Sequence, residues 1–273
     1  MGVQDWIDYL GGTDTMERYL MWSGGKDSTA SLILCHENGI HLDGIIFSEV
    51  MFDHSRNISA ENPTFIKWIY ETAIPKIKEM GYNVIVVRAD KDYLHYFHKE
   101  YKHSRNHENG KKYGFPMSGR CYVNDRLKVK PMEQIKKQLR QNGQIEEIVG
   151  IAYDEPKRLE SAYKRGQRSV LAEFAVCERD TYDICKRYGL LSPLYDDRSR
   201  GGCWFCPNAS IKEFSALRRD YPQLWKELVN LSKTENLATY GFKFSKTVQQ
   251  VEAEIDQYEQ NLSIEQNQMT IFE

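Results

Sequence analysis

Long apolar runs are missing from this 273-residue sequence. No stretch approaches the roughly 20 consecutive apolar residues that a membrane-spanning helix needs, and the opening residues MGVQDWIDYL carry acids where a secretory signal would carry basic residues. An excess of one charge is missing too, because 37 Lys and Arg residues stand against 39 Asp and Glu residues. We therefore expect a cytoplasmic protein with no membrane partner, and its overall charge indicates no preference for nucleic acid.

Cysteine is also scarce, with six residues and none after Cys206. In a reducing compartment such cysteines are thiols, metal ligands or packing residues more often than disulfides. The sequence shows no internal repeat. Its length and its 41% hydrophobic content suffice for one substantial core with a smaller elaboration.

Two kinds of apolar segment alternate along the chain. Strand-like segments cover residues 17–22, 42–50, 82–88 and 145–152, and segments with helical spacing cover residues 28–37, 65–80, 127–139, 169–188 and 211–231. Strands that alternate with helices indicate a parallel sheet. The pattern is lost over residues 90–119, which we interpret as an active-site loop.

These segments predict an α/β fold, with an open, mostly parallel sheet flanked by helices in a main domain of residues 1–195. We expect a small C-terminal elaboration in residues 196–273, made of a cysteine knuckle, a helix and a flexible tail.

The join between the first strand and the first helix reads SGGKDS. Glycines let the backbone approach an anion at a helix N-terminus, where unpaired N–H groups and a partial positive charge attract phosphate. The hydroxyls and the lysine add donors, and the aspartate caps the helix or holds Mg²⁺ through water. The predicted phosphate-binding residues are Ser23, Gly24, Gly25, Lys26, Asp27 and Ser28. The spacing is not that of a Walker A motif, and the alternative is a glycine-rich turn with an ordinary helix cap.

SGGKDS after a strand resembles the PP-loop of the adenine nucleotide alpha-hydrolase superfamily. Three later segments, LKVKPM at 127–132, VGIAYDEPKR at 149–158 and RGGCWFCP at 200–207, resemble the phosphoadenosine phosphosulfate (PAPS) reductase-like branch in sequence and order. The resemblance implies an open parallel sheet that binds ATP or a related adenylyl nucleotide with Mg²⁺, and chemistry at the alpha-phosphate.

The resemblance also implies site residues outside the loop. Gly150 and Arg158 lie in the segment that lines the nucleotide pocket, so we expect Gly150 to bind nucleotide and Arg158 to act with Lys26 and Asp27 in catalysis. Glu49 follows the second strand, at the edge of the sheet where ligands bind, and could contact ribose or Mg²⁺; an acid there could equally end the strand.

Cys203 and Cys206 form a C-x-x-C turn whose two thiolates can reach one metal. The resemblance adds Cys121, because the iron–sulfur reductases of this branch carry a cysteine pair about eighty residues before their second pair. This sequence has only Cys121 at that place, so we expect the fourth ligand to be Cys185, with Cys177 as the alternative.

Four thiolates suit either Zn²⁺ or an iron–sulfur cluster, and the branch favours the cluster. The alternative is that Cys203 and Cys206 pack as small hydrophobic residues beside Trp204 and Phe205.

The resembled reductases use a nucleophilic cysteine near the C-terminus, and this chain has none there. Without a thiol nucleophile, sulfonucleotide reduction lacks its first step. We therefore predict an enzyme that adenylates an acceptor, for sulfur transfer or nucleic-acid modification. The alternatives are a sulfonucleotide reductase and a non-catalytic, nucleotide-sensing module associated with DNA.

Two further segments suggest partners. Gln268 to Phe272 (QMTIF) resembles the peptide that docks on bacterial sliding clamps, or it folds back on the core. His98 to Lys112 mixes basic and aromatic residues, as a loop that follows a nucleic-acid backbone would, or it is a solvated surface loop.

Overall fold

The computed structural model describes residues 16–103, 105, 108–116, 121–196, 201–239, 241–244 and 246–270, the side chains of residues 142 and 265–270 excepted. The chain forms two compact units. Unit 1 is made of the described parts of Met1–Glu49, Asn62–Arg88 and Lys128–Gly201, and unit 2 of Val50–Glu61, Ala89–Leu127 and Gly202–Glu273. The domain boundary expected after residue 195 lies close to Gly201, where the chain passes from unit 1 to unit 2 for the last time. Unit 2 also includes two earlier segments, Val50–Glu61 and Ala89–Leu127. The expected active-site loop of residues 90–119 belongs to it.

Unit 1 contains a five-stranded parallel sheet in the order β5-β2-β1-β6-β7. Its strands are β1 (Glu17–Trp22), β2 (Gly44–Glu49), β5 (Val84–Arg88), β6 (Ile145–Val149) and β7 (Gln167–Arg168). Along the chain, β2 and β5 are added in turn on one side of β1, and β6 and β7 are then added on its other side. The α/β fold with an open parallel sheet is confirmed, and the strand order reverses between β1 and β6.

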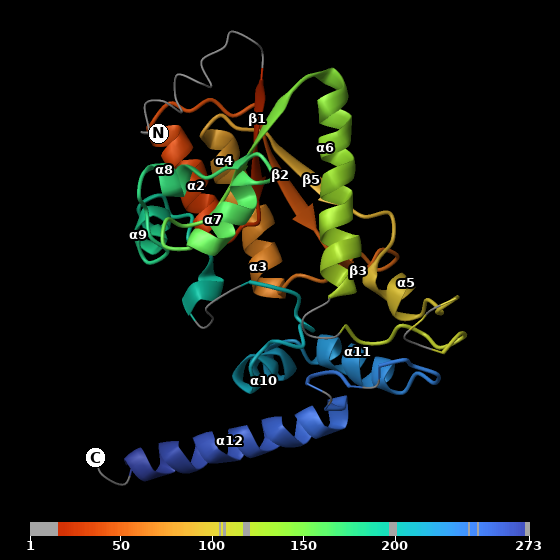
Figure 1. Ribbon diagram of the computed structural model, residues 1–273. Helices are drawn as coiled ribbons and strands as arrows, with labels where there is room; N and C mark the ends of the chain where they lie inside the picture. Colours follow the sequence, from red (N-terminus) through yellow and green to blue (C-terminus); the bar gives the residue numbers. More distant parts are fainter. Residues whose placement is uncertain are drawn as a thin grey trace. The chain divides into compact units, whose positions relative to one another are not determined.

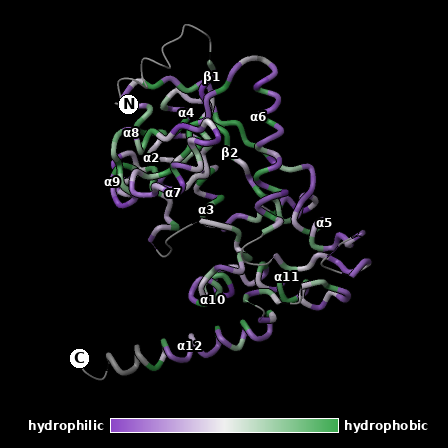
Figure 2. The backbone as a smooth tube through the Cα atoms, viewed as in Figure 1, coloured by the Kyte–Doolittle hydropathy of each residue, from purple (hydrophilic) through white to green (hydrophobic). Residues whose placement is uncertain are grey.

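Helices cover both faces of this sheet (Figure 1). They are α2 (Lys26–Glu37), α3 (Pro63–Trp68), the π-helical segment η1 (Ile69–Ala73), α4 (Ile74–Glu79), α6 (Lys130–Asn142), α7 (Pro156–Tyr163), α8 (Val170–Glu173), α9 (Asp180–Arg187) and the 3-10 turn η3 (Pro193–Asp196). A second π-helical segment, η2 (Asn124–Val129), precedes α6. Figure 2 shows the apolar strands between these more polar helices.

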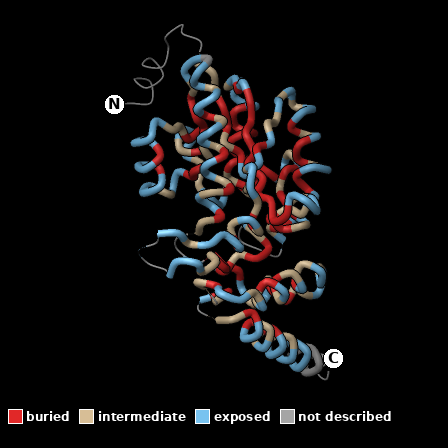
Figure 3. Tube along the Cα trace, turned by 90° about the vertical axis from the view of Figure 1, so that its right-hand side faces the viewer, coloured by how far each residue is buried: buried red, intermediate tan, exposed pale blue. Residues whose placement is uncertain are grey.

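Alternating side chains of the strands supply two cores. Leu20 and Trp22 of β1 pack with α2, α3 and α9 in the larger core, whereas Tyr19 packs on the opposite face with Ile135 and Leu139 of α6. Because successive strand residues point to opposite faces, one strand serves both layers. The central strand β2 is buried throughout, and Figure 3 shows exposed residues on the outer faces of the helices.

Two long helices expected from the sequence are each broken in two. Residues 169–188 form α8 and α9, separated where Ala175 adopts φ +52°, a backbone conformation that ends a helix. Residues 211–231 form α10 (Ile211–Asp220) and α11 (Pro222–Ser232). Pro222 has no N–H to donate, and the preceding Tyr221 is non-helical at φ −134° and ψ 61°.

Unit 2 has an aromatic core. Its elements are the antiparallel pair β3 (Met51–Asp53) and β4 (Ile58–Ser59), α5 (Tyr93–Phe97), α10, α11 and α12 (Val248–Thr270). Its core includes the buried rings of Phe52, Tyr93, Phe97, Phe115, Trp204, Phe205, Phe214, Trp225 and Phe242. Residues 90–119 therefore supply side chains to this core. The sequence did not predict this, because these residues show no regular spacing of apolar side chains.

The flexible tail expected at the C-terminus is wrong as far as Thr270, because α12 occupies it. Val248, Val251 and Ile255 are buried, while Leu262 and Ile264 are 37% and 55% exposed. The sliding-clamp segment ends at Phe272, which lies outside the described residues. Within the described residues, none of the helices has the length and apolar character that a membrane crossing requires.

Candidate functional site

The loop between β1 and α2 is held by hydrogen bonds among its own polar groups. The Ser28 hydroxyl donates to Gly25 O at 3.0 Å and accepts from the Ser23 N–H at 3.1 Å, and the two serine hydroxyl oxygens lie 3.1 Å apart. The Gly25 N–H donates to Ser23 Oγ at 3.3 Å. Ser23, Gly25 and Ser28 thus form one closed turn at the start of α2, as their clustering in the sequence predicts.

Two glycines allow close packing around this turn. Gly24 has φ +73°, and a Cβ there would lie 2.5 Å from Ile69 Cδ1. Gly150 follows β6, and a Cβ on it would lie 2.4 Å from Ser28 N. The turn lies at the carboxyl end of β1, and Gly150 at that of β6, where the strand order reverses. Ligands of open parallel sheets bind at this position.

Lys26 is the buried cation of the site. Its side chain is 4% exposed, and Nζ lies 2.7 Å from Asp27 Oδ1, 2.8 Å from Glu178 Oε1 and 5.2 Å from the centre of the Tyr182 ring. Burial alone would lower the pKa of Lys26, but the hydrogen bonds to Asp27 and Glu178 outweigh it and raise that pKa above its ordinary value. Lys26 is therefore charged at neutral pH.

Segments far away in sequence complete the loop. The Lys26 N–H donates to the Tyr195 hydroxyl at 2.9 Å, and the Thr181 hydroxyl lies 3.1 Å from Asp27 Oδ1. Asp154 accepts from the Glu178 N–H at 2.9 Å. Sequence reasoning missed Glu178, Thr181 and Tyr195. Only Asp154 lay inside a motif already recognised, the VGIAYDEPKR segment.

Cys185 contacts the backbone of this loop. Its thiol is fully buried in the core of unit 1 and donates to Lys26 O at 3.2 Å. Burial raises the pKa of Cys185 to about 12, which keeps the thiol protonated. The role of Cys185 as the fourth metal ligand, expected from the sequence, stays a prediction. Cys177, the alternative, is also in unit 1, and its N–H donates to Asp180 Oδ2 at 3.1 Å.

Glu49 and Arg158 already have side-chain partners. Glu49 is 2% exposed, and its Oε2 accepts from the Tyr70 hydroxyl at 2.6 Å and from Arg88 Nε at 2.8 Å. Arg158, on the first turn of α7, pairs with Glu155 and is 59% exposed. These contacts place Glu49 in a buried network at the ends of β2 and β5, and Arg158 on the surface. Their predicted roles remain predictions.

Cys203 and Cys206 lie on one turn in unit 2. The Cys206 N–H donates to Cys203 O at 3.0 Å, and Cys203 forms an antiparallel bridge with Glu61. The ammonium group of Lys243 donates to Ala209 O at 2.5 Å and to Pro207 O at 3.3 Å. Contacts with Glu61 and Lys243 therefore hold the turn on both sides. Lys243 was not predicted from the sequence.

Cys121 joins the same aromatic core as Cys203. Both are partly buried and pack against that core. Burial, followed by Tyr122 and then these two thiols, raises the pKa of the fully buried Tyr93 well above its ordinary value. As the structure stands, no three His, Cys, Asp or Glu side chains among its described residues are close enough to hold a metal ion. Cys121, Cys203 and Cys206 are thus candidate ligands of one unit, and metal binding would have to draw their thiols together.

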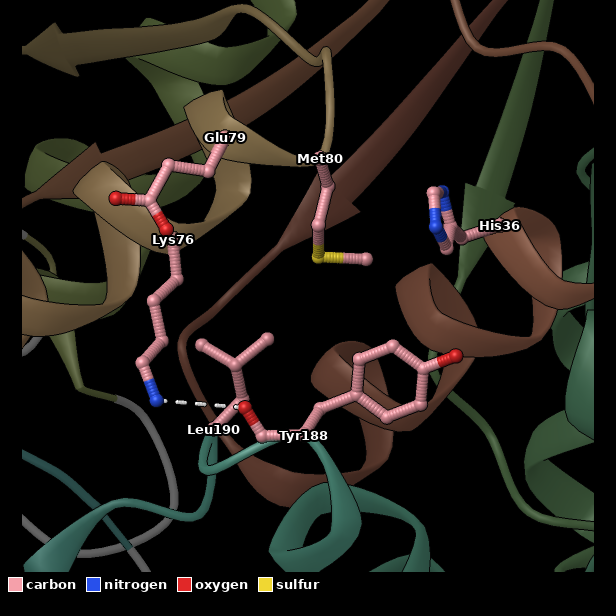
Figure 4. Close-up of a pocket in the computed structure, with 6 residues that line it drawn as sticks. All are labelled: His36, Lys76, Glu79, Met80, Tyr188 and Leu190. Carbon is pink, nitrogen blue, oxygen red and sulfur yellow. Dashed lines mark hydrogen bonds between the residues drawn. The ribbon is translucent and has the colours of Figure 1, made fainter.

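A separate surface cavity of about 370 Å³ lies at the other end of α2 (Figure 4). Its lining residues are His36, Lys76, Glu79, Met80, Tyr188 and Leu190. Lys76 Nζ donates to Gly189 O at 3.0 Å and to Tyr188 O at 3.4 Å. The ammonium group therefore holds the turn that follows α9. No predicted site residue lines this cavity.

Comparisons with known proteins identify one similar solved structure and no matching family or curated protein. No protein-family profile matches the sequence, and no curated protein matches it. Among solved structures, the U34-tRNA thiolase NcsA from Methanococcus maripaludis with its 4Fe-4S cluster is similar at 14% identity, over 90% of this chain and 82% of that chain, with a TM-score of 0.40. A likeness of this size assigns neither a family nor an activity to the chain.

Proposed function

We propose that the protein is a PP-loop enzyme that binds ATP at Ser23 to Ser28 and transfers its adenylyl group to an acceptor. One observation carries the proposal: a glycine-containing turn and a buried lysine meet at the N-terminus of α2, where the strand order reverses. The first N–H groups of a helix have no acceptor within the helix itself, and the helix dipole favours an anion at that end. The turn also resembles the PP-loop, which supports alpha-phosphate chemistry.

The charges around Lys26 indicate how the nucleotide enters. Asp27 and Glu178 both contact Lys26 Nζ, so the three groups carry a net charge of −1 and oppose a triphosphate. Glu178 is 57% exposed and can move away, which frees Lys26 for a phosphate oxygen. Carboxylate oxygens are the ligands that Mg²⁺ prefers, so Asp27 and Glu178 would hold it. When bound, Mg²⁺ would neutralise charge on the phosphates.

The reaction we propose forms one bond and breaks one. A nucleophile on the acceptor attacks the alpha-phosphorus, and the bond from that phosphorus to the bridging oxygen breaks, releasing pyrophosphate. Lys26 and the helix N-terminus stabilise the negative charge that develops on the phosphate oxygens, an effect worth several kcal/mol in water-excluded sites.

The acceptor we favour is a nucleic acid, for sulfur transfer after activation. The segment from His98 to Lys112 supports this, since Lys99 and Lys102 are exposed beside the stacked rings of Tyr101 and Tyr113, whose centroids are 4.2 Å apart. Basic and aromatic side chains together suit a flexible nucleic-acid strand. Docking of Gln268 to Phe272 on a sliding clamp remains part of this proposal.

Cys121, Cys203 and Cys206 would hold an iron–sulfur cluster or Zn²⁺ in this enzyme. Thiolates are ligands that both bind well. A bound cluster would supply the sulfur or electron chemistry that the remaining residues lack.

The test is nucleotide binding followed by exchange. Lys26→Ala should weaken ATP binding in Mg²⁺ by at least about tenfold, the scale of a lost charge-assisted hydrogen bond, and chelation of Mg²⁺ should weaken wild-type binding. Equilibrium dialysis measures both. Exchange of labelled pyrophosphate into ATP, with RNA or DNA as acceptor, detects cleavage at the alpha-phosphate.

Lys67→Ala is the matched control, because Lys67 is 71% exposed in unit 1. It should bind ATP like the wild type. Unchanged affinity in Lys26→Ala would exclude the site. Binding without exchange for any acceptor would favour the nucleotide-sensing module, and formation of sulfite from a sulfonucleotide would favour the reductase.

A further inference from the structure

Positive charge is concentrated in one segment of unit 2. Residues 95–127 contain seven Lys and Arg residues and three Asp and Glu residues, whereas the whole chain has slightly more acidic than basic residues. This segment therefore carries an excess of positive charge that the net charge of the chain conceals. A local excess of this kind attracts anions and raises their concentration near the surface.

Two short stretches of this segment pair in antiparallel fashion. The Tyr113 N–H donates to Lys99 O at 2.9 Å, and Glu100 forms an antiparallel bridge with Lys112. Because successive side chains of extended backbone point to opposite faces, Lys99, Tyr101 and Tyr113 share one face. Glu100 lies on the other face, so its carboxylate does not offset the Lys99 charge there.

Tyrosine rings hold the two cations at this face. Lys99 is exposed, and its Nζ lies 5.6 Å from the centre of the Tyr96 ring and 6.0 Å from that of the Tyr113 ring. The guanidinium carbon of Arg126 lies 5.6 Å from the centre of the same Tyr96 ring. No carboxylate in the described part of the chain forms an ion pair with Lys99 or Arg126. A cation held by an aromatic ring keeps its charge, so both groups can bind an anion.

The tyrosine rings are held in place by the core of unit 2. Tyr101 and Tyr113 stack with their centroids 4.2 Å apart. Tyr96 and Tyr113 both pack against Tyr122, with centroids 6.3 and 5.7 Å away, and Tyr122 lies parallel to the buried Tyr93. Tyr96, Tyr101 and Tyr113 are only partly buried. Rings fixed in this way lose little conformational freedom when a planar ligand stacks on them.

We propose that this tyrosine face, made of Tyr96, Lys99, Tyr101, Tyr113 and Arg126, binds single-stranded nucleic acid. Lys99 and Arg126 bind phosphates of the strand, and its bases stack on the exposed parts of the tyrosine rings. A single strand fits better than a duplex, because its bases are free to stack on protein side chains. The proposal rests on the proposed function in taking this strand as the acceptor, but binding at the face needs no ATP.

The test of the two cations is the salt dependence of binding. A labelled single-stranded oligonucleotide of mixed sequence, offered as DNA and as RNA, is titrated with the full chain, and fluorescence anisotropy gives the affinity. Lys99→Ala and Arg126→Ala should each reduce the slope of log affinity against log salt concentration by about 0.7, the value for one phosphate contact of a single strand. Lys226→Ala, at an exposed position of α11 in the same unit, is the matched control and should keep the wild-type slope.

The test of the rings separates stacking from charge. Tyr101→Leu should weaken binding by about 5- to 150-fold, the scale of one lost stacked base, and should leave the salt slope unchanged. Tyr101→Phe keeps the ring and should bind like the wild type, which also guards against a folding defect as the cause. A duplex of the same sequence should bind more weakly than the single strand.

Three outcomes would overturn the proposal. Wild-type protein that binds neither the DNA nor the RNA strand at low salt would exclude the tyrosine face as a binding surface. Salt slopes of Lys99→Ala and Arg126→Ala equal to that of Lys226→Ala would show that the strand binds elsewhere. Equal affinity for duplex and single strand would exclude stacking. Failure of the nucleotide site is seen separately, as absence of ATP binding by a chain that still binds the strand.

Discussion

Gly150 contributes to the phosphate loop through the side chain it lacks. The backbone after β6 lies against the first turn of α2, so any Cβ at this position meets Ser28 N and Cα, at 2.4 and 2.6 Å. These are backbone atoms of a helix start, which cannot rotate away as a side chain can. The family resemblance predicts Gly150 to bind nucleotide, and the structure shows that a glycine here allows this close backbone contact.

Gly150→Ala should therefore destabilise the protein by about 1–3 kcal/mol, the usual cost of forcing an extra methyl group into a packed region. It should weaken ATP binding as well, because the displaced part is the phosphate-binding turn. Urea unfolding and equilibrium dialysis measure the two effects. Gly143→Ala is the control, since a Cβ there has no neighbour within 4 Å; equal stability of the two variants would contradict the argument.

Recognition of site residues depended on their being neighbours in sequence. Ser23 to Ser28 are consecutive, so the sequence alone indicates that they act together as an anion-binding turn. Glu178 and Tyr195 reach Lys26 from more than 150 residues away. Tyr93 and Lys243 likewise come to the cysteine turn from separate segments of unit 2. Each is a common residue type without a local motif, and only tertiary contacts reveal it.

At the scale of elements, helix boundaries follow caps and breaks. α10 begins with a capping box, in which Ser210 Oγ accepts from the Glu213 N–H at 3.2 Å and Glu213 Oε2 accepts from the Ser210 N–H at 2.7 Å. This cap lies four residues after Cys206. It therefore fixes the direction in which the chain leaves the cysteine turn.

Ser210→Ala should lower the free energy of unfolding by about 1 kcal/mol, because the N-terminal amides of α10 lose their acceptor. The midpoint of urea unfolding reports the change. Ser263→Ala, at an exposed position of α12, should leave that midpoint nearly unaltered. A Ser210→Ala midpoint as high as that of Ser263→Ala would show that the cap contributes nothing.

At the scale of the whole molecule, the chain crosses between its two units several times. Unit 1 carries the sheet and the phosphate loop, and unit 2 carries the aromatic core with the cysteines. The two compact units therefore differ from the predicted single boundary after residue 195. Composition does not change where the chain crosses at Glu49, Glu61 and Arg88, so nothing local marks these points.

Truncation after Asn261 should leave stability unchanged within about 0.5 kcal/mol, the range of surface changes. The buried residues of α12, Val248, Val251 and Ile255, and the ion pair of Arg218 with Glu259 are all retained. The shortened chain should fail to bind a sliding clamp, because it lacks Gln268 to Phe272. Urea unfolding and a pull-down with purified clamp test this; clamp binding by the truncated chain would exclude the tail as the docking peptide.

The sequence alone determined the parallel α/β sheet and the SGGKDS turn at the start of α2, because alternating hydrophobic periods and a contiguous six-residue motif are local properties of the chain. The tertiary structure decided the partners of Lys26, the burial of Cys185 beside Lys26 O and the packing of Tyr93 against Phe205. Each of these depends on burial and on contacts between distant segments. Burial sets whether a thiol or a phenol is charged, and no local pattern encodes it.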